Sequence, residues 1–393
     1  MLSAFRCGWV QSRHSAPIWD HQEGGIILSR NFLADAFEIA CHRMAAGTLP
    51  RRDFLKVASL AAAAGLVGTR AAQAQAKEVV FANWGGDSEV IYGEAWGVPF
   101  EEATGIPVVF DGEGPTAGRI RSMVTNNSVT WDLCDGGVDA GNLAAHGFLE
   151  PVDYTIVDKN KVLEGFRYDW GLTGYMFSSV IAYNKAKFGD APPQTWADFW
   201  DVEKFPGKRT MYKYMDGTLE SMLLADGVKP EDVYPIDLER ALAKLAELRE
   251  HIIFWDTGSS SQQLLRDEEV VMGQIWNTRA HLVRDETGGA IDYHWNNAIL
   301  QPGVWSVPKG NPAGKDVWRF LAFMQDPESQ IEVLKGLGNA PANPEAAKFY
   351  TPELEARSAT APANLATQFV VKPDWYIDNH AEAAKRYLEV ISG

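Results

Sequence analysis

Residues 79–96 read VVFANWGGDSEVIYGEAW, and this stretch decides the fold. Its first four residues, Val79 to Ala82, form a short apolar run that is typical of a strand buried on both faces. The run ends at residues 83–87, where an open α/β sheet binds ligands. We expect Ser88 to cap a helix, Gly85 and Gly86 to bring the backbone close to a bound molecule, and Trp84 to offer a flat aromatic face. The stretch therefore predicts the first wall of a binding cleft.

Strand-like and helix-like segments alternate outward from this stretch, which predicts a parallel α/β sheet. We expect strands over 79–82, 107–110, 131–134, 180–183, 209–212, 270–276 and 304–308. We expect helices over 88–104, 117–126, 139–146, 196–200, 238–252, 262–266, 315–325 and 328–336. The first three strands end in Trp84, in residues 111–115 and in residues 135–137. These ends should meet at one edge of the sheet.

Length and composition allow two globular domains. The chain has 393 residues, of which 46% are hydrophobic and 22% are charged. Its formal charge of −16 argues against nucleic acid and anionic membranes as partners, and it suits a cationic or neutral small ligand. The 14 tryptophans must lie in cores or in a binding cleft, and composition alone leaves both open.

The N-terminal part has the order of a twin-arginine export signal. Arg51-Arg52 precedes an apolar segment over 57–67, and small residues over 72–76 follow. The apolar segment is too short to anchor the chain across a bilayer. The alternative is a buried Ala-rich helix, which would not need all three features. We therefore expect a periplasmic protein with a signal over 51–76, cleaved after Ala74 or Ala76.

Residues 1–50 are interpreted as an upstream extension that is not part of the mature protein. Removing residues 1–76 changes the formal charge from −16 to −19 and takes away Cys7 and Cys41. Cys134 then has no cysteine with which to form an internal disulfide. A single cysteine without a nearby histidine in sequence is interpreted as a packing residue.

Six motifs, taken in order, resemble one family. They are Asn83-Trp84, Trp131-Asp132-Leu133-Cys134-Asp135, Ala182-Tyr183-Asn184-Lys185, Thr195-Trp196-Ala197-Asp198, Phe205-Pro206-Gly207-Lys208 and Gln274-Ile275-Trp276-Asn277. This order resembles the periplasmic spermidine/putrescine-type solute-binding proteins of ABC importers. The resemblance implies a two-lobed α/β periplasmic-binding-protein fold, type II-like, with hinge crossings. It also implies a small amine ligand, delivery to permease subunits and no catalysis, and we expect a monomer without cofactor or metal.

The resemblance places lobe one at 77–183 plus 304–350 and lobe two at 184–303. A C-terminal helical segment, 351–393, would brace both lobes. The resemblance also implies a ligand trapped between the lobes.

A polyamine cleft needs aromatic faces for the methylene chain and the ammonium groups. Trp84 and Trp276 stand where the family places aromatic residues, and each lies at a strand end beside polar or glycine residues. Further candidates for ligand contact are Tyr175, Tyr214, Trp255 and Asn277. The alternative for any of these aromatics is a core position, and we assign that position to Trp196, Trp200 and Trp318, which have core-like helical spacing.

Carboxylates should pair with the ammonium groups. Asp135 ends the third strand and Asp169 precedes the first crossing, so both are candidates, with an exposed surface position as the alternative. Where the family's polyamine binders have Trp-x-Asp, this chain has Gln301-Pro302-Gly303, although Asp292 lies nearby. The acidic pair expected after a strand of lobe two is represented only by Asp216 and Glu220. These departures leave room for a smaller amine or a zwitterion.

Arg119 and Arg121 suggest an anionic group on the ligand. They follow Thr116, the expected cap of a helix whose free N–H groups could hold a carboxylate or phosphonate. The alternative is a solvated helix face. An enzyme on the same fold is a third hypothesis, but the chain lacks Gly-x-Ser-x-Gly, His-Glu-x-x-His and Walker motifs, and His281 and His294 lack metal-ligand spacing.

Overall fold

The computed structural model describes residues 76–393, and Gln75–Gly393 form one compact unit. The predictions for the upstream extension, for the signal up to residue 75 and for Cys7 and Cys41 lie outside the described residues. Ala76 is described, and its N–H donates to Asp316 Oδ2 at 2.8 Å.

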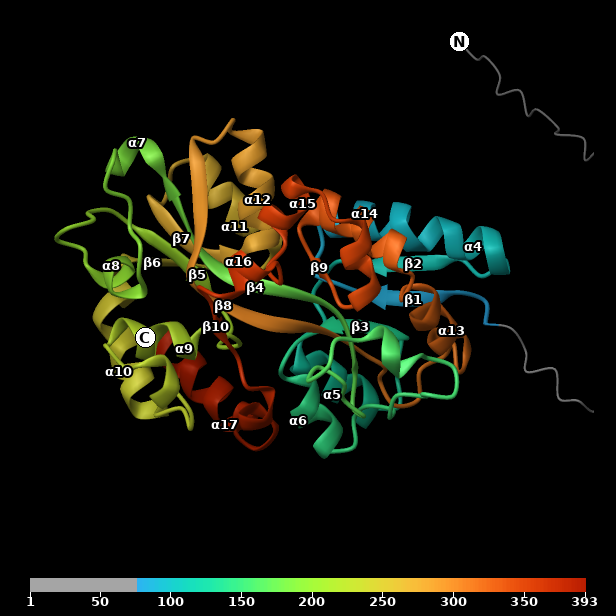
Figure 1. The fold of residues 1–393 in the computed structure, drawn as a ribbon. Coiled ribbons are helices and arrows are strands. Elements are labelled where there is room, and N and C mark those ends of the chain that lie inside the picture. The colour runs from blue at the N-terminus through green and yellow to red at the C-terminus, as the bar shows by residue number, and fades with distance from the viewer. Residues whose placement is uncertain (1–75) are drawn as a thin grey trace, which may run out of the picture. The chain divides into compact units, whose positions relative to one another are not determined.

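A single mixed sheet runs through the described unit in the order β2-β1-β3-β8-β4-β7-β5-β6, with β10 beside β8 and β9 beside β4 (Figure 1). The strands are β1 (Val79–Ala82), β2 (Val108–Asp111), β3 (Leu133–Gly136), β4 (Leu172–Asn184), β5 (Arg209–Tyr212), β6 (Ile252–Trp255), β7 (Met272–Trp276), β8 (Ile291–Ser306), β9 (Ala340–Pro341) and β10 (Phe369–Val370).

Helices follow the strands along the chain. They are α3 (Asp87–Tyr92), α4 (Val98–Thr104), α5 (Ala117–Thr125), α6 (Ala140–Ala145), α7 (Lys185–Phe188), α8 (Trp196–Trp200), α9 (Leu219–Ala225), α10 (Leu238–Leu248), α11 (Gly258–Arg266), α12 (Asn277–Glu286), α13 (Asp316–Phe323), α14 (Pro327–Leu337), α15 (Pro352–Arg357), α16 (Pro362–Leu365) and α17 (Pro373–Ser392). A π-helical turn, Gly93–Gly97, joins α3 to α4.

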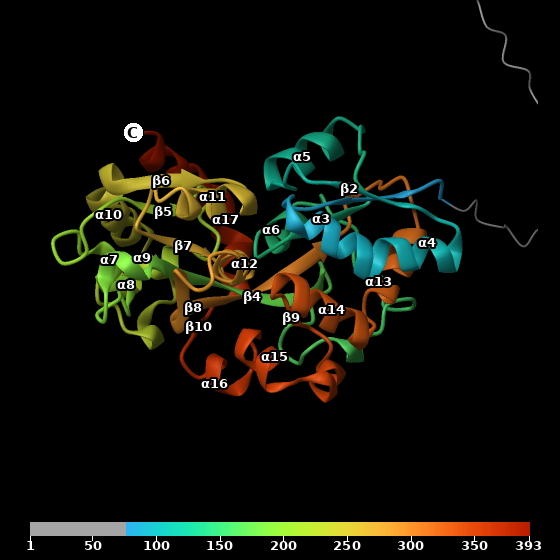
Figure 2. The same ribbon diagram turned by 90° about the horizontal axis from the view of Figure 1, so that it is seen from above.

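The unit has two lobes, which Figure 2 shows side by side, and the sheet runs through both of them. We call the part built on β2-β1-β3 the first lobe and the part built on β7-β5-β6 the second lobe. Within each of these groups the strands are parallel, as the alternation of segments predicts. The ends of β1, β2 and β3 therefore meet at one edge, as expected.

Strands β4 and β8 connect the lobes. They pair with each other in antiparallel fashion; the end of β8 also pairs with β3, and the end of β4 pairs with β7. The sequence predicted only residues 180–183 and 304–308 of these long strands. Gly174, Gly303 and Pro302 interrupt the apolar pattern, and polar residues such as Gln301 alternate with it, so the pattern ends early.

Each lobe has its own hydrophobic core. In the first lobe Phe81 stacks on Tyr92 at 5.7 Å between ring centroids, and Trp96 meets Trp305 at 5.3 Å. In the second lobe Trp196, Phe199 and Trp200 of α8 are buried, as predicted for Trp196 and Trp200. Trp318 is buried in the first-lobe core, also as predicted.

The last helix, α17, contacts both lobes. Its Tyr376, Ala383 and Tyr387 belong to the second-lobe core. On its other side Asn142 of α6 donates to the Ile377 carbonyl at 2.7 Å. This helix is thus a third connection between the lobes, beside β4 and β8.

Capping residues in the sequence located several helices, but three of the predicted helix caps and ends need correction. Thr195 forms the capping box of α8 with Asp198, as its sequence predicts. Ser88, in contrast, is not a cap, because α3 begins at Asp87 after Gly86, whose φ is 66°. Thr116 is the N-cap of α5, but its side chain makes no capping bond. The helix predicted over 238–252 is α-helical to Leu248 and continues as a 3-10 turn over Arg249–His251, after which Ile252 begins β6.

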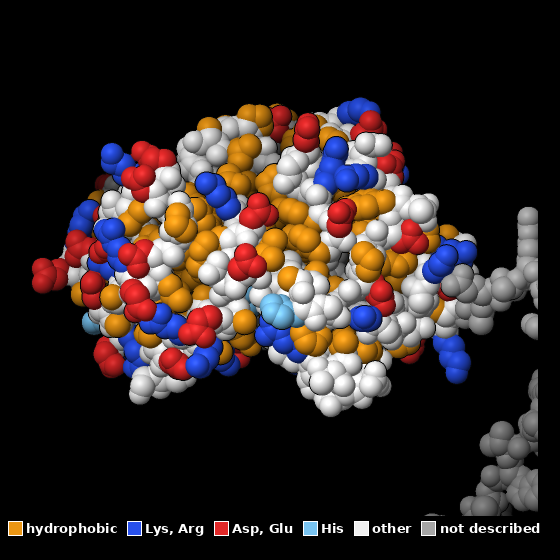
Figure 3. All heavy atoms as spheres, turned by 90° about the horizontal axis from the view of Figure 1, so that it is seen from below, with side chains coloured by type: hydrophobic (Ala, Val, Ile, Leu, Met, Phe, Trp, Pro, Cys, Tyr) orange, Lys and Arg blue, Asp and Glu red, His pale blue; other side chains and the backbone are white. Residues whose placement is uncertain are grey.

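The face seen from below carries acidic and basic side chains side by side over the part of the second lobe that Figure 3 shows, and the outline is indented between the lobes. Among residues 76–393, no helix combines the length and the hydrophobicity that crossing a membrane requires.

Candidate functional site

A cavity of about 300 Å³ lies between the two lobes. Its walls come from the ends of β1 and β3 in the first lobe, the ends of β5 and β7 in the second, the middle of β4 and β8, and one face of α17. Volumes of this size hold small-molecule ligands. Two of the three strand ends selected from the sequence, those at Trp84 and at residues 135–137, therefore border a cavity, whereas residues 111–115 do not line it.

Three aromatic residues form the centre of the cavity wall, and we call them the aromatic cluster: Trp84, Tyr212 and Trp276. The Trp84 ring centroid lies 5.8 Å from that of Trp276 and 6.3 Å from that of Tyr212, and all three rings meet edge to face. Trp84 follows β1, whereas Tyr212 and Trp276 end β5 and β7, so the cluster joins the lobes. Such faces suit a methylene chain or an ammonium group.

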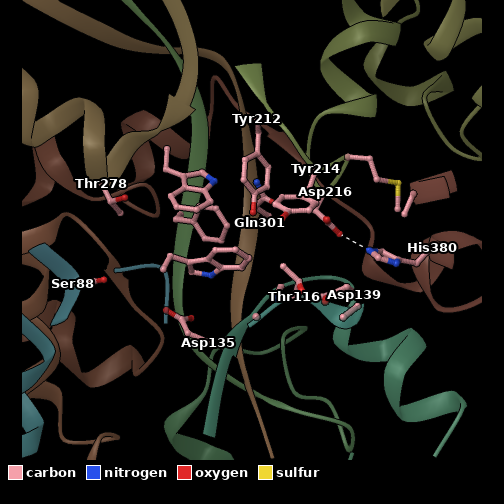
Figure 4. Close-up of a pocket in the computed structure, with 18 of the residues that line it drawn as sticks. Ser88, Thr116, Asp135, Asp139, Tyr212, Tyr214, Asp216, Thr278, Gln301 and His380 are labelled. Carbon is pink, nitrogen blue, oxygen red and sulfur yellow. Dashed lines mark hydrogen bonds and ion pairs between the residues drawn. The ribbon is translucent and has the colours of Figure 1, made fainter. Parts of the chain in front are cut away.

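Asp135 lies at one side of the cluster (Figure 4). It is 2% exposed, and it accepts hydrogen bonds from Tyr175 Oη at 2.7 Å and Tyr92 Oη at 3.4 Å. Asn339 in turn donates to Tyr92 Oη at 2.8 Å. Burial raises the pKa of Asp135 to about 7, although the two tyrosine hydroxyls and the charge of Arg279 oppose the rise. Near neutral pH this carboxyl is thus partly protonated.

Arg279 lines the cavity on the same side. It lies in the first turn of α12 and is 2% exposed. One guanidinium nitrogen, Nη2, donates to the Gly85 carbonyl at 3.1 Å, and Nη1 lies 3.5 Å from Asp87 Oδ2. Its Nε has no hydrogen-bond partner among residues 76–393. Burial lowers the pKa of Arg279, and Asp87 is the largest opposing influence. A guanidinium held this way favours an anionic group.

The opposite side of the cavity carries a second charged group. Asp216, in the loop after β5, lies 2.8 Å from His380 Nε2 of α17. Figure 4 shows Asp139 and Thr116 on the same side. Arg121 also lines this side, and its Nη2 donates to Asn142 Oδ1 at 2.5 Å. Charged groups therefore stand on both sides of the aromatic cluster.

Most of the predicted contact residues lie at the cavity. Trp84, Asp135, Tyr175, Tyr214 and Trp276 all line it. Trp84 and Trp276, which come from different lobes, touch each other as the cleft prediction requires.

Three predicted contact residues lie elsewhere. Trp255 packs behind the cavity wall, 4.4 Å from Tyr212 between centroids, and its Nε1 donates to the Gln274 carbonyl. Asn277 is fully buried, where its amide accepts from the Ser178 N–H and donates to the Gly338 carbonyl. Asp169 is exposed outside the cavity. Strand position alone could not separate a wall residue from the layer behind it.

Of the two arginines that the sequence suggested for an anionic group, one lies at the cavity and the other does not. Arg119 is outside the cavity, where it pairs with Glu113 at 2.9 Å and lies over Trp131, whereas Arg121 lines the cavity. Asp292 is outside as well, paired with Lys185 at 2.7 Å.

The acidic pair expected in the second lobe is also divided. Asp216 lines the cavity, but Glu220 is buried behind it and accepts from Tyr234 and Tyr376. Gln301 occupies the cavity wall in place of the acid that the resemblance implies.

Several cavity residues were missed from the sequence. They are Tyr92, Asp139, Tyr212, Arg279, Asn339 and His380. Arg279 had a usable signal, because it follows Trp276 by three residues at a helix start. His380 had none, since α17 reaches the cavity only through tertiary packing. Among residues 76–393, no group of three His, Cys, Asp or Glu side chains could hold a metal ion.

Residues 95–363 match the model of the bacterial extracellular solute-binding protein family. The chain belongs to this family. Its members supply the substrate-binding component of ABC transporters, and the two-lobed α/β fold described above is the periplasmic-binding-protein fold.

Several proteins that are named for a ligand are similar to this chain. The gamma-aminobutyric acid-binding protein of Pseudomonas aeruginosa is 32% identical over 332 residues, which cover 82% of this chain and 93% of the relative. The structure of the GABA receptor Atu4243 is 33% identical, with a TM-score of 0.71 and coverage of 80% and 97%. The binding protein MotA of A. tumefaciens B6, solved with glucopine, is 32% identical, with a TM-score of 0.75 and coverage of 80% and 99%.

The spermidine/putrescine-binding protein PotD of Streptococcus pneumoniae is also similar, with a TM-score of 0.59 and coverage of 80% of this chain and 99% of PotD. Its identity is 17%, so this similarity concerns the fold. The family assignment made from the six motifs is thus confirmed, while the polyamine type within it stays a prediction.

Proposed function

We propose that the protein is a periplasmic receptor that captures a small zwitterion, an amine and a carboxylate at the two ends of a short aliphatic chain, and delivers it to an ABC permease. The observation that carries this proposal is the buried guanidinium of Arg279, a residue of the cavity wall, whose Nε has no hydrogen-bond partner among residues 76–393. GABA has this chemistry, and two relatives bind it.

Arg279 accounts for the carboxylate end. A buried cation without a full set of acceptors is stabilised by an anionic ligand, and hydrogen bonds to a charged acceptor are the strong ones. Thr278 also lines the cavity and carries a hydroxyl group, whereas the Ser88 hydroxyl donates to the Gly85 carbonyl at 2.8 Å. A diamine would instead bring a second positive charge close to Arg279.

The aromatic cluster accounts for the chain and the amine. Trp84, Tyr212 and Trp276 present ring faces and edges from both lobes, and an ammonium over such rings gains about 0.5–2 kcal/mol. Asp216 and Asp139 supply negative charge farther along the cavity. The ligand would thus touch both lobes and hold them together.

The polyamine predicted from the motifs is the second candidate. It is favoured by one observation, namely that carboxylates stand on both sides of the aromatic cluster, Asp135 on one and Asp139 and Asp216 on the other. Two observations argue against a polyamine. Tyr92 and Tyr175 already donate hydrogen bonds to Asp135, and the Asp135 pKa of about 7 reduces the negative charge of this carboxyl at neutral pH.

Thermal unfolding with a ligand panel tests the proposal. A ligand that binds only the folded state raises the melting temperature with its concentration. We expect GABA to raise it and putrescine, spermidine, inorganic phosphate and an aminophosphonate to raise it less. Chromatography of the mixture after incubation should return GABA unchanged, because we propose binding without catalysis. Conversion of GABA to a product would favour the enzyme hypothesis.

A further inference from the structure

We propose that Asp139, Asp216 and His380 form a proton-operated contact between the lobes, in which protonated His380 favours the closed form and its deprotonation favours opening. The inference rests on lobe closure and does not depend on the identity of the solute. It concerns the side of the cavity away from Arg279.

The three residues come from three separate parts of the fold. Asp139 is the N-cap residue of α6 in the first lobe, and its Oδ1 accepts from the Gly137 N–H at 3.1 Å. Asp216 follows β5 in the second lobe, and His380 lies on α17. All three line the interlobe cavity. Because α17 packs on both lobes, opening would move Asp139 of the first lobe away from Asp216 of the second, and His380 would lose at least one of its two neighbouring carboxylates.

Closure places two carboxylates on one side of a low-dielectric cavity. Like charges at such a site repel, and a cation between them removes the repulsion. Asp216 Oδ1 contacts His380 Nε2 at 2.8 Å, and His380 is 6% exposed. The Nδ1 atom of His380 has no hydrogen-bond partner among residues 76–393, so within this range the imidazole is hydrogen-bonded to Asp216 alone.

The charges around His380 favour its protonated form. Burial alone lowers the pKa of His380, but the charge and the hydrogen bond of Asp216 and the charge of Asp139 outweigh burial and raise it. Burial, followed by the charge of Asp216, raises the pKa of Asp139, while His380 lowers it. Arg121 of α5 is the cation that opposes protonation of His380.

Another acid packs against the same helix. Glu220 of α9 accepts a hydrogen bond from Tyr376, which lies one helical turn before His380 on α17, and burial raises the pKa of Glu220. It does not line the cavity. It therefore stays with the second lobe on opening and does not change sides with Asp139.

The sign of the effect follows from linkage. A histidine that has one carboxylate neighbour fewer in the open form has a higher pKa in the closed form, so its protonation stabilises the closed form, fully below the pKa of the open form. The stabilisation is lost as the pH rises through the raised value. One coupled proton changes the ratio of closed to open protein by at most about tenfold per pH unit.

Asp135 has a pKa of about 7 in the closed structure, so its titration would also favour the closed form at low pH, as that of His380 does. The test therefore uses an Asp135→Asn background. Fluorescence energy transfer between dyes on Ser128→Cys in the first lobe and Glu231→Cys in the second measures closure; both positions are exposed. Cys7→Ser and Cys41→Ser remove two competing thiols, and Cys134 is buried.

The ligand-free full chain is followed from pH 5.5 to 8.5. We expect the closed fraction to fall with pH in the background protein and to stay constant after His380→Asn or Asp216→Asn. His251→Asn is the matched control, because His251 is exposed on the second lobe, and it should keep the decline. Far-ultraviolet circular dichroism checks folding, and Asp216→Asn replaces His380→Asn if that variant does not fold. A decline that survives His380→Asn or Asp216→Asn, or a background protein with no decline, overturns the proposal.

Discussion

The indole rings of Trp84 and Trp276, which belong to opposite lobes, lie 5.8 Å apart between centroids at an interplanar angle of 64°. Residues 192 positions apart in the chain thus meet at the centre of the cavity. Because the two rings belong to opposite lobes, we expect lobe opening to break this contact.

Replacing Trp84 by alanine should weaken GABA binding about tenfold or more. The change removes a ring face from the cavity and an interlobe contact, and each aromatic pair is worth about 0.5–1.5 kcal/mol beyond its buried area. Calorimetric titration measures the loss. Trp295→Ala is the matched control, since Trp295 lies on β8 outside the cavity, and it should leave the affinity within about twofold.

Replacing Arg279 by alanine should abolish measurable binding of GABA, because the GABA carboxylate would lose its buried charge partner. Truncating one member of a buried ion pair costs about 3–5 kcal/mol. Arg279→Lys should restore little, since an ammonium lacks the planar set of donors. Arg119→Ala is the control, as Arg119 pairs with Glu113 outside the cavity. Equal losses in Arg119→Ala and Arg279→Ala would contradict the assignment.

The sequence predicted the parallel strand groups, and the ends of β1 and β3 that it selected border the cavity. Trp84 follows the strand Val79–Ala82 by two residues, and Trp276 is the last residue of the strand Met272–Trp276, so an apolar run with a ring at or just after its end located both halves of the wall. Trp255 ends β6 in the same way, yet it is covered by Tyr212 and Trp276. A strand end gives the edge of a sheet, but the depth of a side chain depends on its neighbours.

Residues from distant elements could not be predicted. His380 lies 164 positions after its partner Asp216, on a helix whose place beside the cavity depends on tertiary packing alone. Asp169 shows the opposite error: it lies close to β4 in sequence, but it is exposed away from the cavity. The long strands β4 and β8 were underestimated for a local reason, the glycines and prolines within them.

Tyr175→Phe should lower both affinity and stability. It removes the 2.7 Å hydrogen bond to the buried Asp135, and a buried acceptor that loses its partner costs about 1–3 kcal/mol. Gly303→Ala should have a similar effect on binding, since an added Cβ would lie 2.2 Å from the Tyr175 ring and displace it. Titration and thermal unfolding of both variants check this. A Tyr175→Phe protein with unchanged affinity would remove Tyr175 from the site.

The stability of the protein should depend on pH through Asp135. Its pKa rises from 3.8 in the unfolded chain to about 7 in the folded protein, so the folded state holds the proton more tightly. Stability is therefore lost as the pH increases from about 4 to 7, by at most about 4 kcal/mol. Asp135→Asn should remove this part of the pH dependence, so its melting temperature relative to wild type should increase from pH 5 to pH 8. A difference that stays constant would contradict the burial argument.

Calorimetric titration of the wild-type protein at pH 7 with GABA, butyrate, butylamine and putrescine tests the central claim most directly. If Arg279 holds a carboxylate while the aromatic cluster holds an amine, GABA should bind at least tenfold more tightly than either single-charge analogue and than putrescine. Putrescine binding as tightly as GABA, or GABA binding no better than butylamine, would contradict the account.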